Sequence, residues 1–165
     1  MKTIDIGYDM ILTRRKPRIV SKPLVMVAMK LQPLLPICTD AVKMYSATGL
    51  LPSERISIHP SVNSKIKLWL DTTLFKKALI DLLGESAKRL AEGCDIGISV
   101  SSTGMHSSRL NISYTHKKST AELNDDECAV HYHSSDRTRE IVTQHQASLN
   151  LRKDGQRVII EILFP

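Results

Sequence analysis

The stretch from residue 71 to residue 93 constrains the fold of this chain more than any other part of the sequence. Asp71 is a favourable N-cap, because a carboxylate can accept hydrogen bonds from the free N–H groups of a first helical turn. Gly93 is suited to end a helix in the left-handed conformation. The pattern predicts one long amphipathic helix over residues 72–90, whose apolar face another layer must cover. That face is formed by Phe75, Leu79, Leu82 and Leu83.

Alternating apolar and polar residues, typical of half-buried β-strands, occur on both sides of this helix. Two alternating segments precede it, and two hairpins follow it, the second of which turns at KDGQ. Between the hairpins, the polar residues 116–135 predict a loop and residues 137–146 predict a short helix. The expected strands are residues 56–58, 66–70, 94–100, 110–114, 147–152 and 158–164.

The N-terminal part of the chain has helical spacing. Residues 1–15 predict a helix that ends before Pro17, because the residue before a proline avoids the helical region. A second helix is predicted from Pro23 to Tyr45, with a kink or break at Pro33 and Pro36. The face of the first helix carries Ile4, Tyr8, Ile11 and Leu12, and that of the second carries Leu24, Val27, Ala28, Leu31 and Leu35.

Three helices and about five strands pack most economically in two layers. We therefore expect an α/β (α+β) two-layer sandwich, in which one mixed, mostly antiparallel sheet carries the three helices on one face. A chain of 165 residues fits one such domain.

Composition and charge exclude several classes of protein. No apolar run approaches the ~20 residues of a membrane-spanning helix, and the opening residues are not a signal peptide, so we expect a cytoplasmic domain without membrane contact. Cys38, Cys94 and Cys128 lack metal-type spacing and are expected to be reduced. The net charge is +6 and its densest cluster lies at residues 14–18, without interleaved aromatic residues. We interpret this cluster as a solvated helix end and do not expect nucleic acid as a partner.

Three stretches resemble the ATPase domain of sensor histidine kinases, members of the GHKL (Bergerat) superfamily. Asp71 and Leu74 match the head of the asparagine box, within LWLDTTLFKKALIDLLGESAKRL. CDIGISVSS and RLNISYTH are similar to the paired central strands, and REIVTQHQASLNLRKDGQRVIIEILFP is similar to the last helix and hairpin. The resemblance implies a linker and the end of a dimerisation helix over residues 1–20, followed by a histidine-kinase-like ATPase domain over residues 21–165.

The departures from the family fall on its nucleotide-binding residues. Asp81 and Glu85 occupy the two asparagine positions, of which the second binds Mg²⁺ in the family, so the resemblance leaves Glu85 as a candidate Mg²⁺ ligand. Lys88 matches a basic residue one turn on and is a candidate phosphate contact. His116 occupies the position of the adenine-recognising aspartate, and the glycines that follow it in the family are absent. A second interpretation is that Asp81 and Glu85 form only the solvated side of an amphipathic helix.

The remaining titratable residues suggest no catalytic site. His131 and His133 share one side of an extended segment, but no third metal ligand accompanies them. Cys128 near His131 lacks a third, orienting group, and His145 is assigned a structural role.

These observations lead to two functional hypotheses. The first is a degenerate, non-catalytic histidine-kinase-like domain without a cofactor, which binds ATP weakly or not at all. It would serve as a scaffold or docking domain for a response-regulator receiver domain or for its own copy. The alternative is a divergent but working catalytic domain of a sensor histidine kinase that binds ATP and Mg²⁺.

Overall fold

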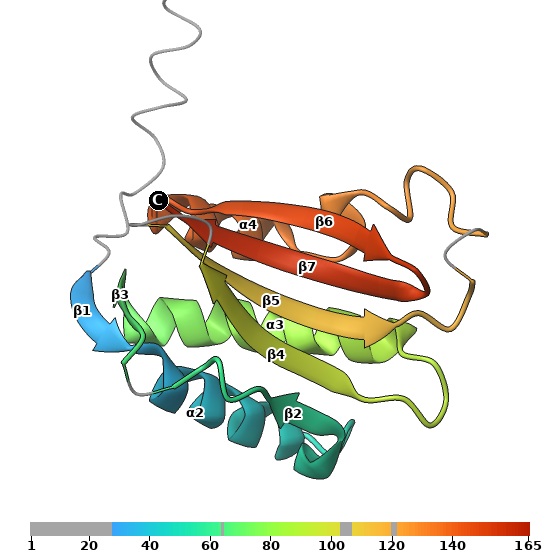
Figure 1. The fold of residues 1–165 in the computed structure, drawn as a ribbon, viewed down its shortest axis with the longest axis horizontal. Helices are drawn as coiled ribbons and strands as arrows, with labels where there is room; N and C mark the ends of the chain where they lie inside the picture. The colour runs from blue at the N-terminus through green and yellow to red at the C-terminus, as the bar shows by residue number, and fades with distance from the viewer. Residues whose placement is uncertain (1–27, 64, 103–106, 120–121) are drawn as a thin grey trace, which may run out of the picture.

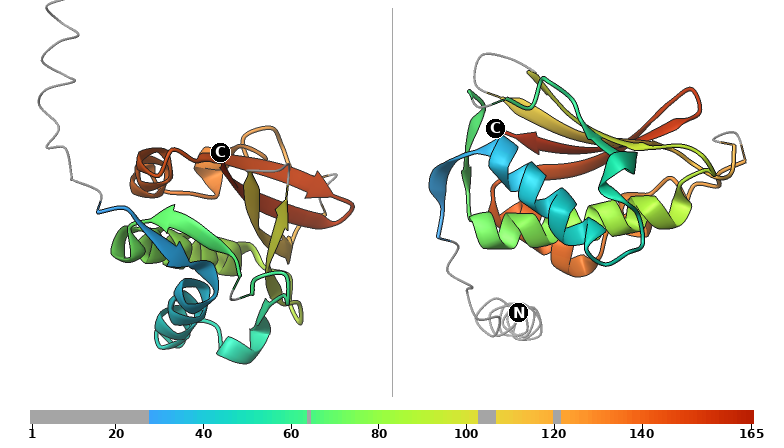
Figure 2. Two further views of the ribbon diagram at one scale, coloured as in Figure 1. Left: turned by 60° about the vertical axis from the view of Figure 1, so that its left-hand side comes forward. Right: turned by 90° about the horizontal axis from the view of Figure 1, so that it is seen from below.

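The computed structural model describes residues 28–63, 65–102, 107–119 and 122–165. In this part of the chain, three α-helices lie on one face of a five-stranded sheet (Figure 1). The helices are α2 (Leu34–Ser46), α3 (Thr72–Arg89) and α4 (Asp136–Gln144). The predicted two-layer sandwich is confirmed, and the views in Figure 2 show the helical layer and the sheet edge-on. The helix expected over residues 1–15, the basic cluster at 14–18 and the linker assigned to residues 1–20 lie outside the described residues.

The main sheet is mixed and mostly antiparallel, as predicted. Its strand order is β2-β4-β5-β7-β6; β2 pairs with β4 in parallel and the other three pairs are antiparallel. The strands are β2 (Ile56–Ile58), β4 (Ile96–Ser102), β5 (Ser108–Thr115), β6 (Ser148–Asp154) and β7 (Arg157–Phe164). The sheet turns its apolar residues toward the helices, because alternate side chains of a strand point to opposite faces.

The expectation of a single sheet was wrong. Strand β3 (Lys67–Leu70) pairs antiparallel with β1 (Lys30–Pro33) in a separate two-stranded ribbon. Residues 30–33 were expected to be helical, but the helix begins only at Leu34. Pro33 is its N-cap and Pro36 lies in its first turn, where a missing N–H costs nothing. The two prolines therefore mark the start of a helix rather than a kink within one.

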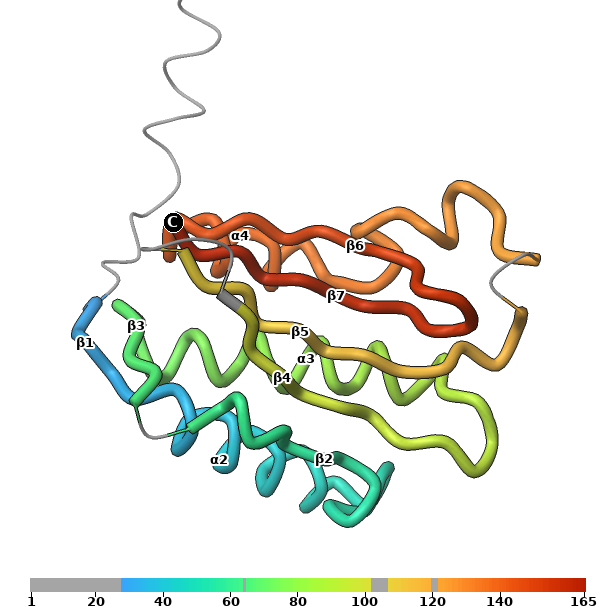
Figure 3. The backbone as a smooth tube through the Cα atoms, viewed as in Figure 1, coloured from blue at the N-terminus to red at the C-terminus, as the bar shows by residue number. Residues whose placement is uncertain are grey.

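The core lies between α3 and the central strands. Leu79, Leu82 and Leu83 of α3 are fully buried in the same apolar cluster as Ile98 of β4 and Ile112 of β5. The tube in Figure 3 shows α3 passing behind these strands. Each such leucine contributes about 1.5–3 kcal/mol relative to an exposed side chain. This packing fixes the position of every polar group that α3 carries on its other sides.

In the described residues, no helix is both long enough and apolar enough to cross a membrane.

Candidate functional site

Asp81 lies on α3 and contacts the start of α4. Its Oδ2 atom accepts hydrogen bonds from the backbone N–H of Ser135, at 3.2 Å, and from the hydroxyl of Thr138. Ser135 is itself the N-cap of α4, because its hydroxyl accepts from the N–H of Thr138 at 3.1 Å. A carboxylate beside a helix N-terminus is also favoured by the helix dipole. Asp81, at the first of the two asparagine positions, thus joins two helices.

Glu85, the candidate Mg²⁺ ligand, lies one turn further along α3 and forms two ion pairs. Its carboxylate accepts from Lys88 Nζ and from Arg89 Nη1, each at 2.7 Å. Burial by itself would raise the pKa of the Glu85 carboxyl, but the hydrogen bonds from Lys88 and Arg89 outweigh it and lower the pKa. The hydrogen bond between Glu85 and Lys88 in turn raises the pKa of Lys88. Lys88, the candidate phosphate contact, therefore bonds to the residue proposed to hold the metal.

Arg89 was not singled out from the sequence, and it connects this helix to the loop at residues 116–135. Its guanidinium carbon lies 4.2 Å from the centre of the Tyr132 ring, a cation–π distance, and its Nη2 donates to the Tyr132 carbonyl oxygen. The spacing of Glu85 and Arg89, four residues apart on a helix, was the available signal. The contact with Tyr132 could not have been read from local spacing.

His116 follows β5 and lies beside the end of α3. Leu90 forms an isolated β-bridge with it, and the backbone N–H of Lys117 donates to the Arg89 carbonyl at 2.7 Å. The ring of His116 is buried, and its Nδ1 accepts from the N–H of Lys118 at 2.9 Å. Burial lowers the pKa of His116, which favours the neutral ring. Among the described residues, its Nε2 atom has no hydrogen-bond partner.

His133 turns inward from the same loop. Its Nε2 lies 2.8 Å from the carbonyl oxygen of Glu127, and its Nδ1 lies 2.8 Å from the hydroxyl of Tyr114 on β5. Because a carbonyl oxygen only accepts, Nε2 carries the proton and Nδ1 accepts from the tyrosine. Burial lowers the pKa of His133. The sequence paired His133 with His131, which is instead exposed.

An ion pair between Glu127 and Lys118 is a further contact of this loop. Glu127 Oε1 accepts from Lys118 Nζ at 2.6 Å, and Glu127 also exchanges hydrogen bonds with Asn124. The bond from Lys118 lowers the pKa of Glu127. The loop is thus held to α3 through Arg89, to β5 through Tyr114, and to itself through Glu127. Within the described residues, no three His, Cys, Asp or Glu side chains are grouped as a metal site.

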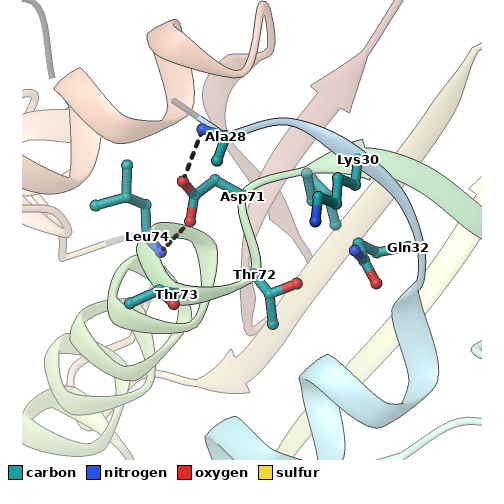
Figure 4. A pocket seen from close by; sticks show the side chains of 8 residues that line it. Ala28, Lys30, Gln32, Asp71, Thr72, Thr73 and Leu74 are labelled. Carbon is teal, nitrogen blue, oxygen red and sulfur yellow. Dashed lines mark hydrogen bonds between the residues drawn. The ribbon is translucent and has the colours of Figure 1, made fainter. Parts of the chain in front are cut away.

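The opposite end of α3 carries a separate cavity of about 430 Å³, shown in Figure 4. Asp71 is the N-cap, as predicted: its Oδ1 accepts from the N–H of Leu74 and its Oδ2 from that of Ala28, each at 3.0 Å. The N–H of Asp71 donates to His145 Nε2 at 3.0 Å, which gives His145 the structural contact expected of it. Fourteen residues of helix, roughly 20 Å, separate this cavity from Glu85.

Solved histidine kinases have the same fold. The chain superposes on histidine kinase AdeS of Acinetobacter baumannii with a TM-score of 0.67 and 12% identity, covering 99% of this chain and 80% of that one. It is also similar to full-length ShkA in complex with AMPPNP (TM-score 0.62, 11% identity), over 87% of this chain and 32% of ShkA. The complex of ThkA with the response regulator TrrA gives a TM-score of 0.63 and 12% identity, over 99% of this chain and 48% of ThkA.

No family model and no curated protein sequence matches the chain. At these identities the likeness shows the fold, which is that of histidine-kinase ATPase domains.

Proposed function

We propose that this chain is a degenerate histidine-kinase-type ATPase domain, which binds ATP weakly or not at all and acts as a cytoplasmic scaffold or docking domain in two-component-type signalling. The observation that carries the proposal is the bonding of Asp81 and Glu85. Asp81 is engaged with α4, and Glu85 with Lys88 and Arg89. A triphosphate bound there would face the carboxylates of Asp81 and Glu85. Lys88, the cation suited to bind it, is already paired with Glu85.

The adenine contact supplies a second line of support. In the family an aspartate accepts a hydrogen bond from the adenine amino group, whereas His116 stands here with its ring buried. A hydrogen bond to a charged group is worth about 1.5–3 kcal/mol. Its loss alone corresponds to a roughly 10–150-fold weaker affinity. No catalytic activity is proposed for this chain.

Calorimetric titration with Mg·ATP and with ADP tests the loss of nucleotide binding. We expect no saturation at millimolar nucleotide. The alternative function, a divergent ATP- and Mg²⁺-binding domain, predicts a low-micromolar Kd that Glu85→Ala weakens. Glu92→Ala is the matched control, because Glu92 is an exposed carboxylate just beyond the same helix. Micromolar binding sensitive to Glu85 and insensitive to Glu92 would refute the proposal.

The docking role is supported by a similar kinase, ThkA, which forms a complex with the response regulator TrrA. It is tested by biolayer interferometry of the immobilised chain against receiver domains from the same organism. We expect at least one to bind without added nucleotide. Binding that requires ATP would contradict a nucleotide-independent docking domain.

A further inference from the structure

The connection between β5 and α4 includes residues 122–135, which we call the 122–135 segment (Figure 1). Two buried histidines lie where this segment meets β5: His133 belongs to the segment and His116 follows the strand, and they are 1% and 4% exposed. The ring centre of Tyr114 on β5 lies 6.3 Å from that of His116 and 6.2 Å from that of His133. Two side chains that ordinarily titrate between about pH 5 and pH 8 are therefore enclosed at one contact.

The hydrogen bonds of His133 suit a neutral ring. Nε2 donates to the Glu127 carbonyl oxygen and Nδ1 accepts from the Tyr114 hydroxyl, each at 2.8 Å. A protonated ring carries an N–H at both nitrogens, so it could no longer accept from Tyr114. The hydroxyl would have to turn its hydrogen away, which would leave a donor without water because Tyr114 is 1% exposed.

The contacts of His116 disfavour protonation in the same way. Its Nδ1 accepts from the backbone N–H of Lys118 at 2.9 Å, and Lys118 Nζ in turn pairs with Glu127 of the segment at 2.6 Å. Protonation of Nδ1 would place a second N–H against that of Lys118. The Nε2 atom has no hydrogen-bond partner among the described residues, so these residues supply a charged ring with no acceptor at either nitrogen.

The charged and titratable groups around the two rings come from three parts of the chain. They are Glu85 and Arg89 of α3, Tyr114 of β5, and Lys117, Lys118, Glu127 and Tyr132 of the connection to α4. Burial lowers the pKa of each histidine, and the positive charge of Arg89 acts in the same direction. Glu127 opposes this effect at His116, and Glu85 does so at the other ring, but each pKa stays below its ordinary value. At neutral pH both rings are thus uncharged while the segment is in place.

We propose that the 122–135 segment is an acid-sensitive device, which protonation of His116 and His133 releases from β5 and α3 while the rest of the domain stays folded. Released rings are hydrated and titrate near pH ~6.5, so opening takes up protons below that pH and the open state is favoured. At about pH 5, each ring can raise the ratio of open to closed molecules by up to roughly 30-fold.

Opening can stay local because the segment contributes little to the main apolar core. Of its residues, Leu123 and Cys128 pack there. Segments with few apolar contacts open at a lower free energy than the core does. Release would also separate Tyr132 from Arg89, which it now contacts. The release does not depend on nucleotide binding, so it stands or falls separately from the proposed function.

The three cysteines of the chain are matched reporters of this opening. Cys128 lies in the segment and is partly buried, Cys94 is partly exposed just before β4, and Cys38 is fully buried in α2. The whole chain is labelled with a pyridyl disulfide, which reacts in mildly acidic solution, at several values from about pH 7.5 to about pH 5. Mass spectrometry of the peptides gives each rate. Dividing the Cys128 rate by the Cys94 rate removes the pH dependence of the reaction itself.

The proposal expects the ratio of the Cys128 rate to the Cys94 rate to rise at least ~10-fold over this range, while Cys38 stays unlabelled. His116→Gln and His133→Gln should each reduce the rise, whether the segment is open or closed in the variant, because glutamine does not titrate. His131→Gln is the matched control, since His131 is an exposed histidine of the same segment, and it should leave the rise unchanged.

A constant ratio in the unmodified chain would overturn the proposal. A full rise in both His116→Gln and His133→Gln would also overturn it, because other groups would then control the opening. Labelling of Cys38 in step with Cys128 would overturn it as well, since the domain would then unfold as a whole.

Discussion

The contact of Asp81 with α4 can be tested by removing its carboxylate. In Asp81→Ala, the Thr138 hydroxyl and the Ser135 N–H both lose their acceptor. Thr138 is 1% exposed, so its hydroxyl cannot turn to water. The Ser135 N–H is exposed and can be hydrated. The loss therefore comes mainly from the buried Thr138 hydroxyl, which keeps only the Ser135 hydroxyl at 3.1 Å, and from the attraction between the carboxylate and the α4 N-terminus.

A buried donor left without a partner costs about 1–3 kcal/mol, and the helix-dipole contribution is about 0.3–1 kcal/mol. Asp81 is only partly buried, which places the expected loss in the free energy of unfolding toward the lower end, about 1–2 kcal/mol. For a chain of this size, such a loss lowers Tm by roughly 2–8 °C.

Urea and thermal unfolding, followed by circular dichroism, measure this loss. Asp40→Ala is the matched control, since Asp40 also joins two helices, through Lys76 at 3.7 Å, but its side chain is 54% exposed. That change should cost less than ~1 kcal/mol. Asp81→Asn keeps an acceptor oxygen and should fall between the two. If Asp81→Ala costs no more than Asp40→Ala, the assigned contact contributes nothing and the reasoning is refuted.

Three further predictions concern buried groups. The free energy of unfolding should fall as the pH drops below about 6.5, because burial lowers the pKa of His116 and of His133. The unfolded chain then binds protons that the folded chain does not. Urea unfolding from about pH 8 to about pH 5 measures this pH dependence, which His133→Gln should reduce. Tyr114→Phe should cost about 1–2 kcal/mol in the same assay at neutral pH, since His133 loses its buried donor. Burial raises the pKa of the Cys38 thiol to about 12, so Cys38 should resist iodoacetamide in the folded protein while Cys94 reacts. Mass spectrometry of the labelled peptides measures both rates. Labelling of Cys38 at the rate of Cys94 would contradict the burial of Cys38.

The elements predicted correctly are those whose pattern is local and long. Helix α3 was expected over residues 72–90 and spans Thr72–Arg89, because a capping aspartate and several turns of apolar spacing agree. The two hairpins were found from alternation alone. The start of β4 was placed two residues early, at Cys94 rather than Ile96, which is within the usual uncertainty of an element boundary.

The strand over residues 66–70 was predicted and is β3, but its partner β1 was missed because the residues of β1 fit two periodicities. Leu31 continues the helical spacing of Leu24, Val27 and Ala28, yet in the structure it lies opposite Trp69 in a strand pair. The backbone N–H of Leu34 donates to the carbonyl of Ile66, so β1 leads directly into a helix that begins beside β3. The periodicity of a short segment is compatible with both a helix and a strand. What decides for the strand here is its pairing partner, which lies more than thirty residues away.

The candidate site was predictable only in part, for the same reason. Sequence spacing placed Asp81, Glu85 and Lys88 on one helix, which the structure bears out. Glu85 pairs with Lys88 and Arg89 on the same helix, but other partners come from far along the chain: Thr138 bonds to Asp81 across 57 residues, and Tyr132 contacts Arg89 across 43. Pairings over such separations depend on how the layers pack, and a local pattern contains no information about that packing.

The pairings of Asp81, Glu85 and Arg89 also bear on the proposal that nucleotide binding is weak. A binding site keeps polar groups available to a ligand, whereas Asp81, Glu85 and Arg89 bond here to other parts of the same chain. A nucleotide that needed Glu85 for its metal ion would first have to separate Glu85 from Lys88 and Arg89. Breaking these bonds subtracts from any affinity gained, and freeing Arg89 would also release Tyr132 and its loop. Under the proposed function, the contacts that stabilise the fold in this region would therefore oppose nucleotide binding.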